Sequence, residues 1–113
     1  MRDPGSYLRD ILDAIARIER YAIRGREAFE QDELVQIWIV HHLQVIGEAA
    51  ARLGRQFHQT YSEVPWPEII AMRNVLVHEY FGLDLEAVWT TVEYDLPKLK
   101  RAVEGILRNY DQH

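Results

Sequence analysis

Apolar residues in the first part of the chain follow a helical spacing. Between residues 6 and 24 they recur at every third or fourth position, which places them on one face of a helix. Ser6 is suited to cap the start of this helix, and Gly25 is suited to end it. The sequence therefore predicts a first amphipathic helix over residues 6–24, with an apolar face made of Leu8, Ile11, Leu12, Ile15, Ile18 and Ala22.

A second helical pattern covers residues 31–53 and stops at Gly54. Its apolar arc is wider than one core-facing side needs, because it includes Leu34, Val35, Ile37, Trp38, Val40, Leu43, Val45, Ile46, Ala49, Ala50 and Leu53. A helix with so wide an arc is expected to be covered on two sides. We predict that one side packs within its own subunit and the other packs against a partner subunit.

The middle of the chain combines a loop with a short helix. Residues 55–65 show little periodicity and are predicted to form a loop. Pro65 and Pro67 flank Trp66, and proline is well tolerated in the first turn of a helix. The third predicted helix begins at this point and extends to about Val77 or His78.

The last third of the chain predicts a fourth helix with an interruption. Asp84 is suited to cap a helix whose apolar positions continue through Leu96. Pro97 cannot donate the hydrogen bond that a helix interior requires, so we expect a break or kink there. The apolar pattern then resumes and continues to about Tyr110.

These segments together predict an all-α fold. No window shows the alternation that is typical of a strand. Four or five amphipathic helices with short connections favour an up-and-down four- to five-helix bundle. The chain has 113 residues, 48% of them hydrophobic and 27% charged, which suits a single globular domain over residues 1–113.

Composition limits the cellular compartment in which we expect the protein and the kinds of chemical site it can form. The chain has no cysteine, which excludes disulfides and thiolate metal sites. The neighbouring His41 and His42 point to different helix faces and no histidine has zinc-site spacing, so we expect no metal and no cofactor. The start of the chain is charged and amphipathic, unlike a signal peptide, and the longest apolar run, residues 37–40, is too short to span a membrane. We therefore expect a cytoplasmic protein without membrane contact.

The net charge of −5 argues against a broad, unspecific grip on nucleic acid, which normally depends on a basic surface. Any contact with nucleic acid would therefore depend on local basic groups. Arg52, Arg55 and Arg73 could form such a patch, although scattered basic residues are more often part of the solvated surface.

Four polar residues interrupt the apolar end of the third predicted helix: Arg73, Asn74, His78 and Tyr80. Polar groups in an apolar run must be paired, exposed or functional. Asn74 and His78 lie four residues apart and share a helix face, whereas Arg73 and His78 lie five apart and diverge by roughly 140°. Arg73 and His78 converge if the helix ends near His78, or if a second subunit brings its own copy close.

The arrangement Arg73-Asn74-x-x-x-His78-x-Tyr80 resembles the R-x-x-x-x-H-x-Y signature of HEPN domains, and specifically of the HepT toxins paired with small nucleotidyltransferase antitoxins. The resemblance extends over nearly the whole chain, and the order of its blocks makes it specific. The blocks are Ile46-Gly47-Glu48-Ala49-Ala50, Val64-Pro65-Trp66, Met72-Arg73-Asn74, Tyr80-Phe81, Val88-Trp89 and Asp95-Leu96-Pro97.

The resemblance implies a fold, an activity and two partners. It implies a helical HEPN homodimer with a composite cleft at its interface, and a metal-independent endoribonuclease that acts on RNA as the toxin of a type II-like toxin–antitoxin system. It also implies a nucleotidyltransferase antitoxin that adenylylates the motif tyrosine, which is Tyr80 in this chain.

The residue types suit that chemistry. RNA carries its own nucleophile, the 2′-hydroxyl, so a metal-free nuclease needs a proton acceptor, a proton donor and positive charge at the phosphorus. His78 can exchange a proton near neutral pH, and the planar fork of Arg73 matches phosphate oxygens. Asn74 can orient the phosphate or His78. With one motif histidine per chain, two subunits would supply acid and base together.

Other interpretations stay open beside this one. The dimer cleft could hold nucleotide or RNA for a partner nucleotidyltransferase without cutting it, or the polar cluster could only lock the dimer. Glu48 is a supporting residue for which a structural salt bridge is favoured over direct catalysis. Trp38, Trp66 and Trp89 are expected to anchor the core and not to stack on bases.

Overall fold

The structure is a computed structural model that describes residues 2–78 and 84–111, except for the side chains of residues 74–78 and 111. Its elements are α1 (Pro4–Ala22), α2 (Arg26–Gln31), α3 (Glu33–Arg52), α4 (Arg55–Thr60), α5 (Trp66–His78), α6 (Leu85–Thr90), the π-helical turn η2 (Thr91–Asp95) and α7 (Leu96–Asp111). The described residues contain no strand. The predicted all-α fold is thus confirmed, whereas the homodimer stays a prediction.

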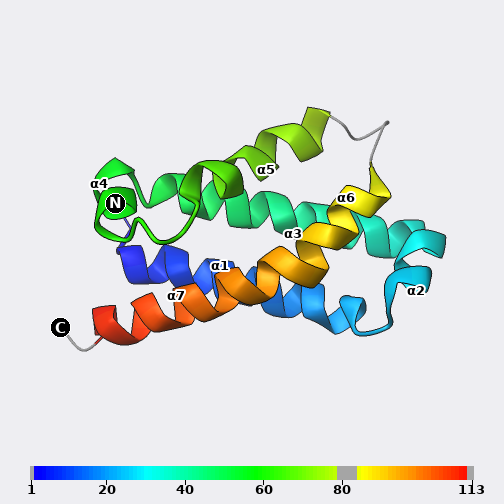
Figure 1. Cartoon of the computed structure of the whole chain (residues 1–113), viewed down its shortest axis with the longest axis horizontal. Helices are drawn as coiled ribbons and strands as arrows, with labels where there is room; N and C mark the ends of the chain where they lie inside the picture. The colour runs from blue at the N-terminus through cyan, green and yellow to red at the C-terminus, as the bar shows by residue number, and fades with distance from the viewer. Residues whose placement is uncertain (1, 79–83, 112–113) are drawn as a thin grey trace.

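The long helices run up and down alongside one another (Figure 1). α3 packs against both α1 and α5, and α7 packs against α1. α6, η2 and α7 follow one another as one continuous arm (Figure 1). In the described part of the chain, the four long arms agree with the predicted four- to five-helix bundle, and the short helices α2 and α4 lie at its turns.

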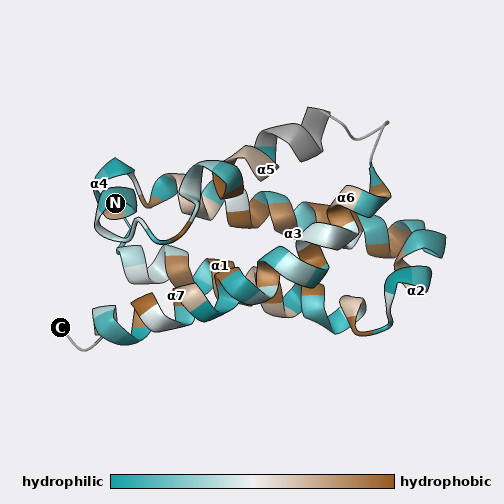
Figure 2. Cartoon of the chain, in the orientation of Figure 1, coloured by the Kyte–Doolittle hydropathy of each residue, from teal (hydrophilic) through white to brown (hydrophobic). Residues whose placement is uncertain are grey.

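The core forms where the apolar faces of these helices meet. Figure 2 shows brown apolar and teal polar positions sharing the surfaces of α1 and α7, as expected of amphipathic helices. The side chains that are almost completely buried include Leu8, Ile11, Ile15, Ile18, Ile39, Leu43, Ile46 and Val103. None of the helices in the described ranges is long and apolar enough to cross a membrane.

The wide apolar arc of α3 is covered largely within its own chain. α1 packs along one side of this helix, and α5 packs along another. Leu34 and Ile37, near its first residue, remain exposed by 78% and 38%. The two-sided burial is therefore confirmed, but α5 of the same chain supplies much of the second layer. Contact between α3 and a partner subunit stays a prediction.

The first helix begins earlier than predicted. Its cap residue is Asp3, and Pro4 occupies the first turn, so the assignment of Ser6 as the cap is wrong. The physical reason is that proline lacks the N–H group that would have no partner in the first turn of a helix, and it already has a helical φ. Ser6 instead accepts a hydrogen bond from Arg2. Gly25, with φ of 95°, follows the end of α1 as predicted.

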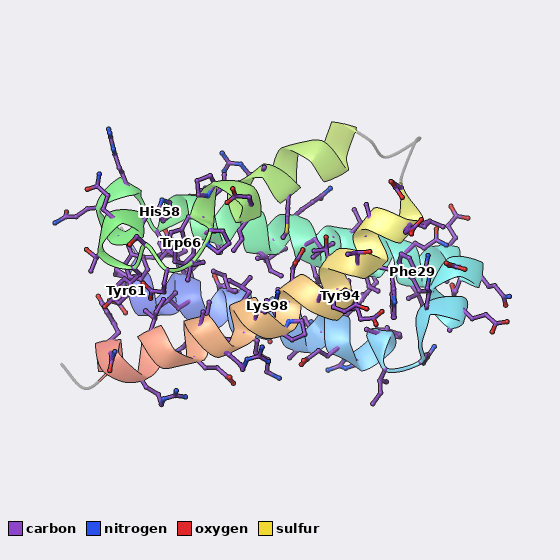
Figure 3. The ribbon with its side chains drawn as sticks, viewed as in Figure 1. Phe29, His58, Tyr61, Trp66, Tyr94 and Lys98 are labelled. Atoms are coloured by element: carbon purple, nitrogen blue, oxygen red, sulfur yellow. The ribbon has the colours of Figure 1, made fainter. Side chains whose placement is uncertain are left out.

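Two short helices depart from the predicted pattern. α2 was not anticipated, and α4 occupies the first six residues of the predicted loop at residues 55–65, which was therefore wrong there. Each helix follows a glycine with positive φ, Gly25 or Gly54. Six residues are too few to show a helical period, so packing decides their form. Figure 3 shows Phe29 of α2 at one end of the bundle, and His58 of α4 at the other end together with Tyr61 and Trp66.

The last arm begins and continues almost as predicted. The Asp84 carboxylate caps α6 by accepting a hydrogen bond from the Ala87 amide at 3.1 Å. Near Pro97 the helix neither stops nor breaks, and the π-helical turn η2 comes immediately before α7. Pro97 has no N–H to donate to the preceding turn, so the hydrogen-bond pattern shifts locally. The predicted interruption is thus a local distortion, and the helical path extends to Asp111.

Candidate active site

Three of the four motif residues lie on α5. Arg73 and Asn74 lie in its second half, and the helix includes the backbone of His78. The side chains of Asn74 and His78 and the whole of Tyr80 lie outside the described residues. The roles predicted for these three residues therefore stay predictions, and the described geometry of the site centres on Arg73.

Gly47 sets the distance between α3 and α5 at this point. A Cβ atom placed on Gly47 would lie 3.0 Å from the Arg73 amide nitrogen and 3.1 Å from both Arg73 Cβ and the Ile69 carbonyl oxygen. These distances are shorter than ordinary van der Waals contacts. Glycine thus allows the backbone of Arg73 to rest directly on α3.

Glu48 follows Gly47 and contacts the Arg73 side chain. Arg73 Nη1 donates to Glu48 Oε2 at 3.0 Å, joining residues 25 positions apart in the sequence. The Arg73 side chain is 34% exposed, so it remains accessible from solvent. The salt bridge that was favoured for Glu48 is present. Because its partner is Arg73, the ion pair is part of the candidate site.

Arg52 joins the same carboxylate from the next turn of α3. Its Nε atom donates to Glu48 Oε1 at 2.9 Å, so the two oxygens of Glu48 each contact a different guanidinium. The spacing of four residues on one helix is the sequence signal that could have predicted this pair. Of the suggested basic patch, the structure joins Arg52 to Arg73 through Glu48, and no contact among the described residues joins Arg55 to them.

The described contacts leave the Arg73 guanidinium able to bind an anion. Only one of its nitrogens, Nη1, contacts Glu48, and this side chain has no other partner among the described residues. The adjacent Nε and Nη2 groups form a planar fork that matches two oxygens of a phosphate. His78 lies five residues further along α5, which is about 7.5 Å along the helix axis. An anion on Arg73 would therefore lie within one to two turns of the motif histidine.

Two of the other histidines have structural roles. His42 is buried and its Nδ1 donates to the Trp38 carbonyl at 2.7 Å. His58 Nε2 donates to the Ala50 carbonyl at 2.7 Å, and its ring stacks on Trp66. His41 lies exposed on α3. Across residues 2–78 and 84–111, no three His, Asp or Glu side chains gather in a group that could hold a metal ion.

The tryptophans anchor the core, as predicted for Trp66 and Trp89. Both are buried, and their indole N–H groups donate to the Tyr61 carbonyl and to Glu93 Oε2. Trp38 is partly buried against the core and donates to the Arg17 carbonyl at 2.8 Å.

Comparison with known proteins gives one family. Residues 11–106 match the family model described as ribonuclease HepT-like. The chain is 38% identical over 109 residues to a protein of Caldanaerobacter subterraneus subsp. tengcongensis named putative RNase, a match that covers 96% of this chain and 97% of the relative. It is 38% identical over 106 residues to a protein of Thermococcus cleftensis named probable ribonuclease HepT, which covers 93% of this chain and 96% of the relative.

A third relative is a longer protein. The chain is 34% identical over 113 residues to a Methanocaldococcus jannaschii protein named gamma-glutamylcyclotransferase and putative RNase. The match covers 99% of this chain but only 51% of that relative, so the chain spans about half of its length. No solved structure matches the chain.

Proposed function

The chain belongs to the HepT-like ribonuclease family, and from this membership we propose that it is a metal-independent endoribonuclease whose reaction depends on Arg73 and His78. The observation that carries the proposal is the set of contacts around Arg73. The Arg73 backbone packs against Gly47, and Glu48 accepts a hydrogen bond from one guanidinium nitrogen. The other two nitrogens are available to bind a phosphate, and His78 lies on the same helix.

The proposed reaction uses the 2′-hydroxyl of RNA as the nucleophile. One histidine takes the hydroxyl proton while O2′ forms a bond to the neighbouring phosphorus. The bond from phosphorus to O5′ breaks, and O5′ receives a proton from a second histidine. The products are a 2′,3′-cyclic phosphate and a 5′-hydroxyl end. Arg73 binds the non-bridging oxygens and stabilises the negative charge that develops on them.

The need for two histidines leads to the proposed homodimer. The motif supplies one histidine per chain, so acid and base come from His78 of two subunits at a shared cleft. Asn74 is proposed to orient the phosphate or His78 through its amide. Dimer formation is then part of the mechanism, because a single chain would lack one of the two proton-transfer groups.

Control by a nucleotidyltransferase antitoxin is the remaining part of the proposal. Attachment of AMP to the Tyr80 hydroxyl releases pyrophosphate from ATP and adds bulk and negative charge to the motif. The modified toxin would then be unable to bind RNA in the cleft. Incubation with a cognate nucleotidyltransferase and ATP should add the mass of one AMP, or several, to the intact chain. A gain that persists in Tyr80→Phe, or no gain at all, would refute this assignment.

An RNA-cleavage assay with a chelator present tests the proposed function. Wild type should cleave single-stranded RNA, whereas Arg73→Ala and His78→Ala should each lower kcat by about a hundredfold or more. Arg101→Ala on α7 is a matched control, because Arg101 is exposed and makes no ion pair with a described residue. Cleavage that persists in both site variants would defeat the assignment. RNA binding without cleavage by the wild type would support the binding role instead.

A further inference from the structure

Glu48 holds two guanidinium groups beside each other on the surface of α3 and α5. Its Oε1 accepts from Arg52 Nε at 2.9 Å, and its Oε2 accepts from Arg73 Nη1 at 3.0 Å. Two such contacts and one carboxylate separate the two nitrogen atoms by at most about 8 Å. The two cations therefore lie within reach of neighbouring phosphates on one nucleic-acid strand.

Each guanidinium keeps donors that Glu48 does not use. Arg52 bonds through Nε, so its terminal Nη1 and Nη2 groups remain for another acceptor, and its side chain is 61% exposed. Arg73 bonds through Nη1 and keeps the Nε and Nη2 edge. Glu48 is the one partner that the described residues supply to either side chain. A phosphate can thus approach each arginine without breaking the ion pairs.

The charge balance favours an anion at this place. Two arginines and one glutamate leave a local charge of +1 on a chain whose net charge is −5. A single carboxylate shared by two guanidiniums holds them close despite their mutual repulsion. Such a cluster can bind phosphates without a broad basic surface. An acidic chain has to contact RNA through local basic groups of this kind.

We infer that Arg52 is a second phosphate-binding residue, which contacts the RNA phosphate next to the one held by Arg73, and that Glu48 positions both guanidiniums. This inference rests on the proposed ribonuclease function. Arg52 then contributes to RNA affinity, while Arg73 contributes to the chemical step. The opposing interpretation is an exposed ion pair between residues four apart on a helix, which stabilises a protein only slightly and touches no ligand.

RNA binding in a background that cannot cut separates these interpretations. A labelled single-stranded RNA oligonucleotide is titrated with His78→Ala, and then with the same chain carrying Arg52→Ala, Arg52→Lys or Arg101→Ala, over a range of potassium chloride concentrations. Arg52→Ala should weaken binding about fivefold to tenfold and reduce the slope of log affinity against log salt by about 0.7, the value for one phosphate contact on a single strand.

The two further variants make the test specific. Arg52→Lys keeps the charge and should restore most of the slope but not the full affinity, because lysine lacks the fork. Arg101→Ala removes the same formal charge from α7 and should leave the slope unchanged. In the cleaving enzyme, Arg52→Ala should raise KM with little change in kcat, a split that a purely structural role would not produce.

Two outcomes would overturn the inference. One leaves the proposed ribonuclease function standing, and the other refutes that function as well. If Arg52→Ala and Arg101→Ala give the same salt slope and affinity while the wild type still cleaves RNA, Arg52 is not a phosphate ligand and the proposed function stands. If the wild type neither binds nor cleaves RNA, the proposed function fails and the inference fails with it.

Discussion

At the residue scale, Glu48 is the carboxylate that contacts both Arg52 and Arg73. From the sequence it is a carboxylate among small residues that needs a partner, and a structural salt bridge is a sufficient explanation. The structure gives it two partners, one of which is the motif residue Arg73. A salt bridge and a role in the proposed site are therefore compatible, because the same contact would serve both.

Replacing Glu48 with glutamine should separate positioning from electrostatics. The amide keeps the shape but loses the charge that holds both guanidiniums, so we expect kcat for RNA cleavage to fall about tenfold. RNA affinity should not weaken, because the site loses a negative charge. Both ion pairs are exposed, so the free energy of unfolding should change by less than about 1 kcal/mol.

Glu19→Gln provides the matched control for this prediction. Glu19 on α1 pairs with Lys100 on α7, an exposed ion pair that involves none of the motif residues. Its kcat should equal that of the wild type. An unchanged kcat for Glu48→Gln would contradict the positioning role.

At the element scale, the contact between α3 and α5 builds the described part of the site. α5 alone would present Arg73 without a partner, and α3 alone would present the pair of Glu48 and Arg52. Their close approach at Gly47 joins the two. By contrast, α7 packs on α1 and closes the core without contributing to the described contacts of Arg73.

Gly47→Ala should disturb the site through the spacing of these helices. The added Cβ would crowd the Arg73 backbone and the Ile69 carbonyl, and this overpacking should exceed the helix-propensity gain of alanine, for a net loss of about 1 kcal/mol in the free energy of unfolding. Cleavage should also fall, because Arg73 is displaced from Glu48. Chemical denaturation and the cleavage assay measure the two effects.

Gly105→Ala is the control for that substitution. Gly105 lies inside α7, and the nearest atom to an added Cβ would be Arg108 Nη2 at 3.8 Å, an ordinary contact. The same chemical change should therefore stabilise the chain by about 0.5 kcal/mol and leave cleavage unchanged. Equal behaviour of the two alanine variants would show that the approach at Gly47 is not under strain.

At the scale of the whole molecule, the proposed mechanism depends on more than one chain. The described chain is an elongated bundle, 45 × 26 × 23 Å, in which α3 is covered on two sides by helices of its own subunit. The described residues account for the core without a partner. The homodimer is therefore proposed for the chemistry, which needs two copies of His78.

Mixing subunits tests this dependence. When wild type and His78→Ala chains are unfolded and refolded together, activity should fall as the square of the wild-type fraction, because only dimers with two intact histidines have both acid and base. Mixing with Arg101→Ala chains should leave activity unchanged. A linear decline with the wild-type fraction would mean that each chain works alone and would contradict the composite cleft.

The sequence by itself determined the long helices and several of their limits, because these depend on neighbours within a few residues. The periodic apolar positions, the cap at Asp84 and the start of α5 at Trp66 are signals of this local kind, and the polar motif was visible as an interruption of them. The short helices α2 and α4 escaped prediction, since six residues carry no readable period.

Only the tertiary structure decided which residues contact Arg73. Glu48 and Arg73 are 25 residues apart, and no local pattern specifies which polar residue on one helix meets which on another. That pairing depends on the register of α3 against α5, which is set by the missing side chain at Gly47 and by burial along the interface. Packing, which acts between distant segments, thus joined a predicted motif to the carboxylate and the second arginine beside it.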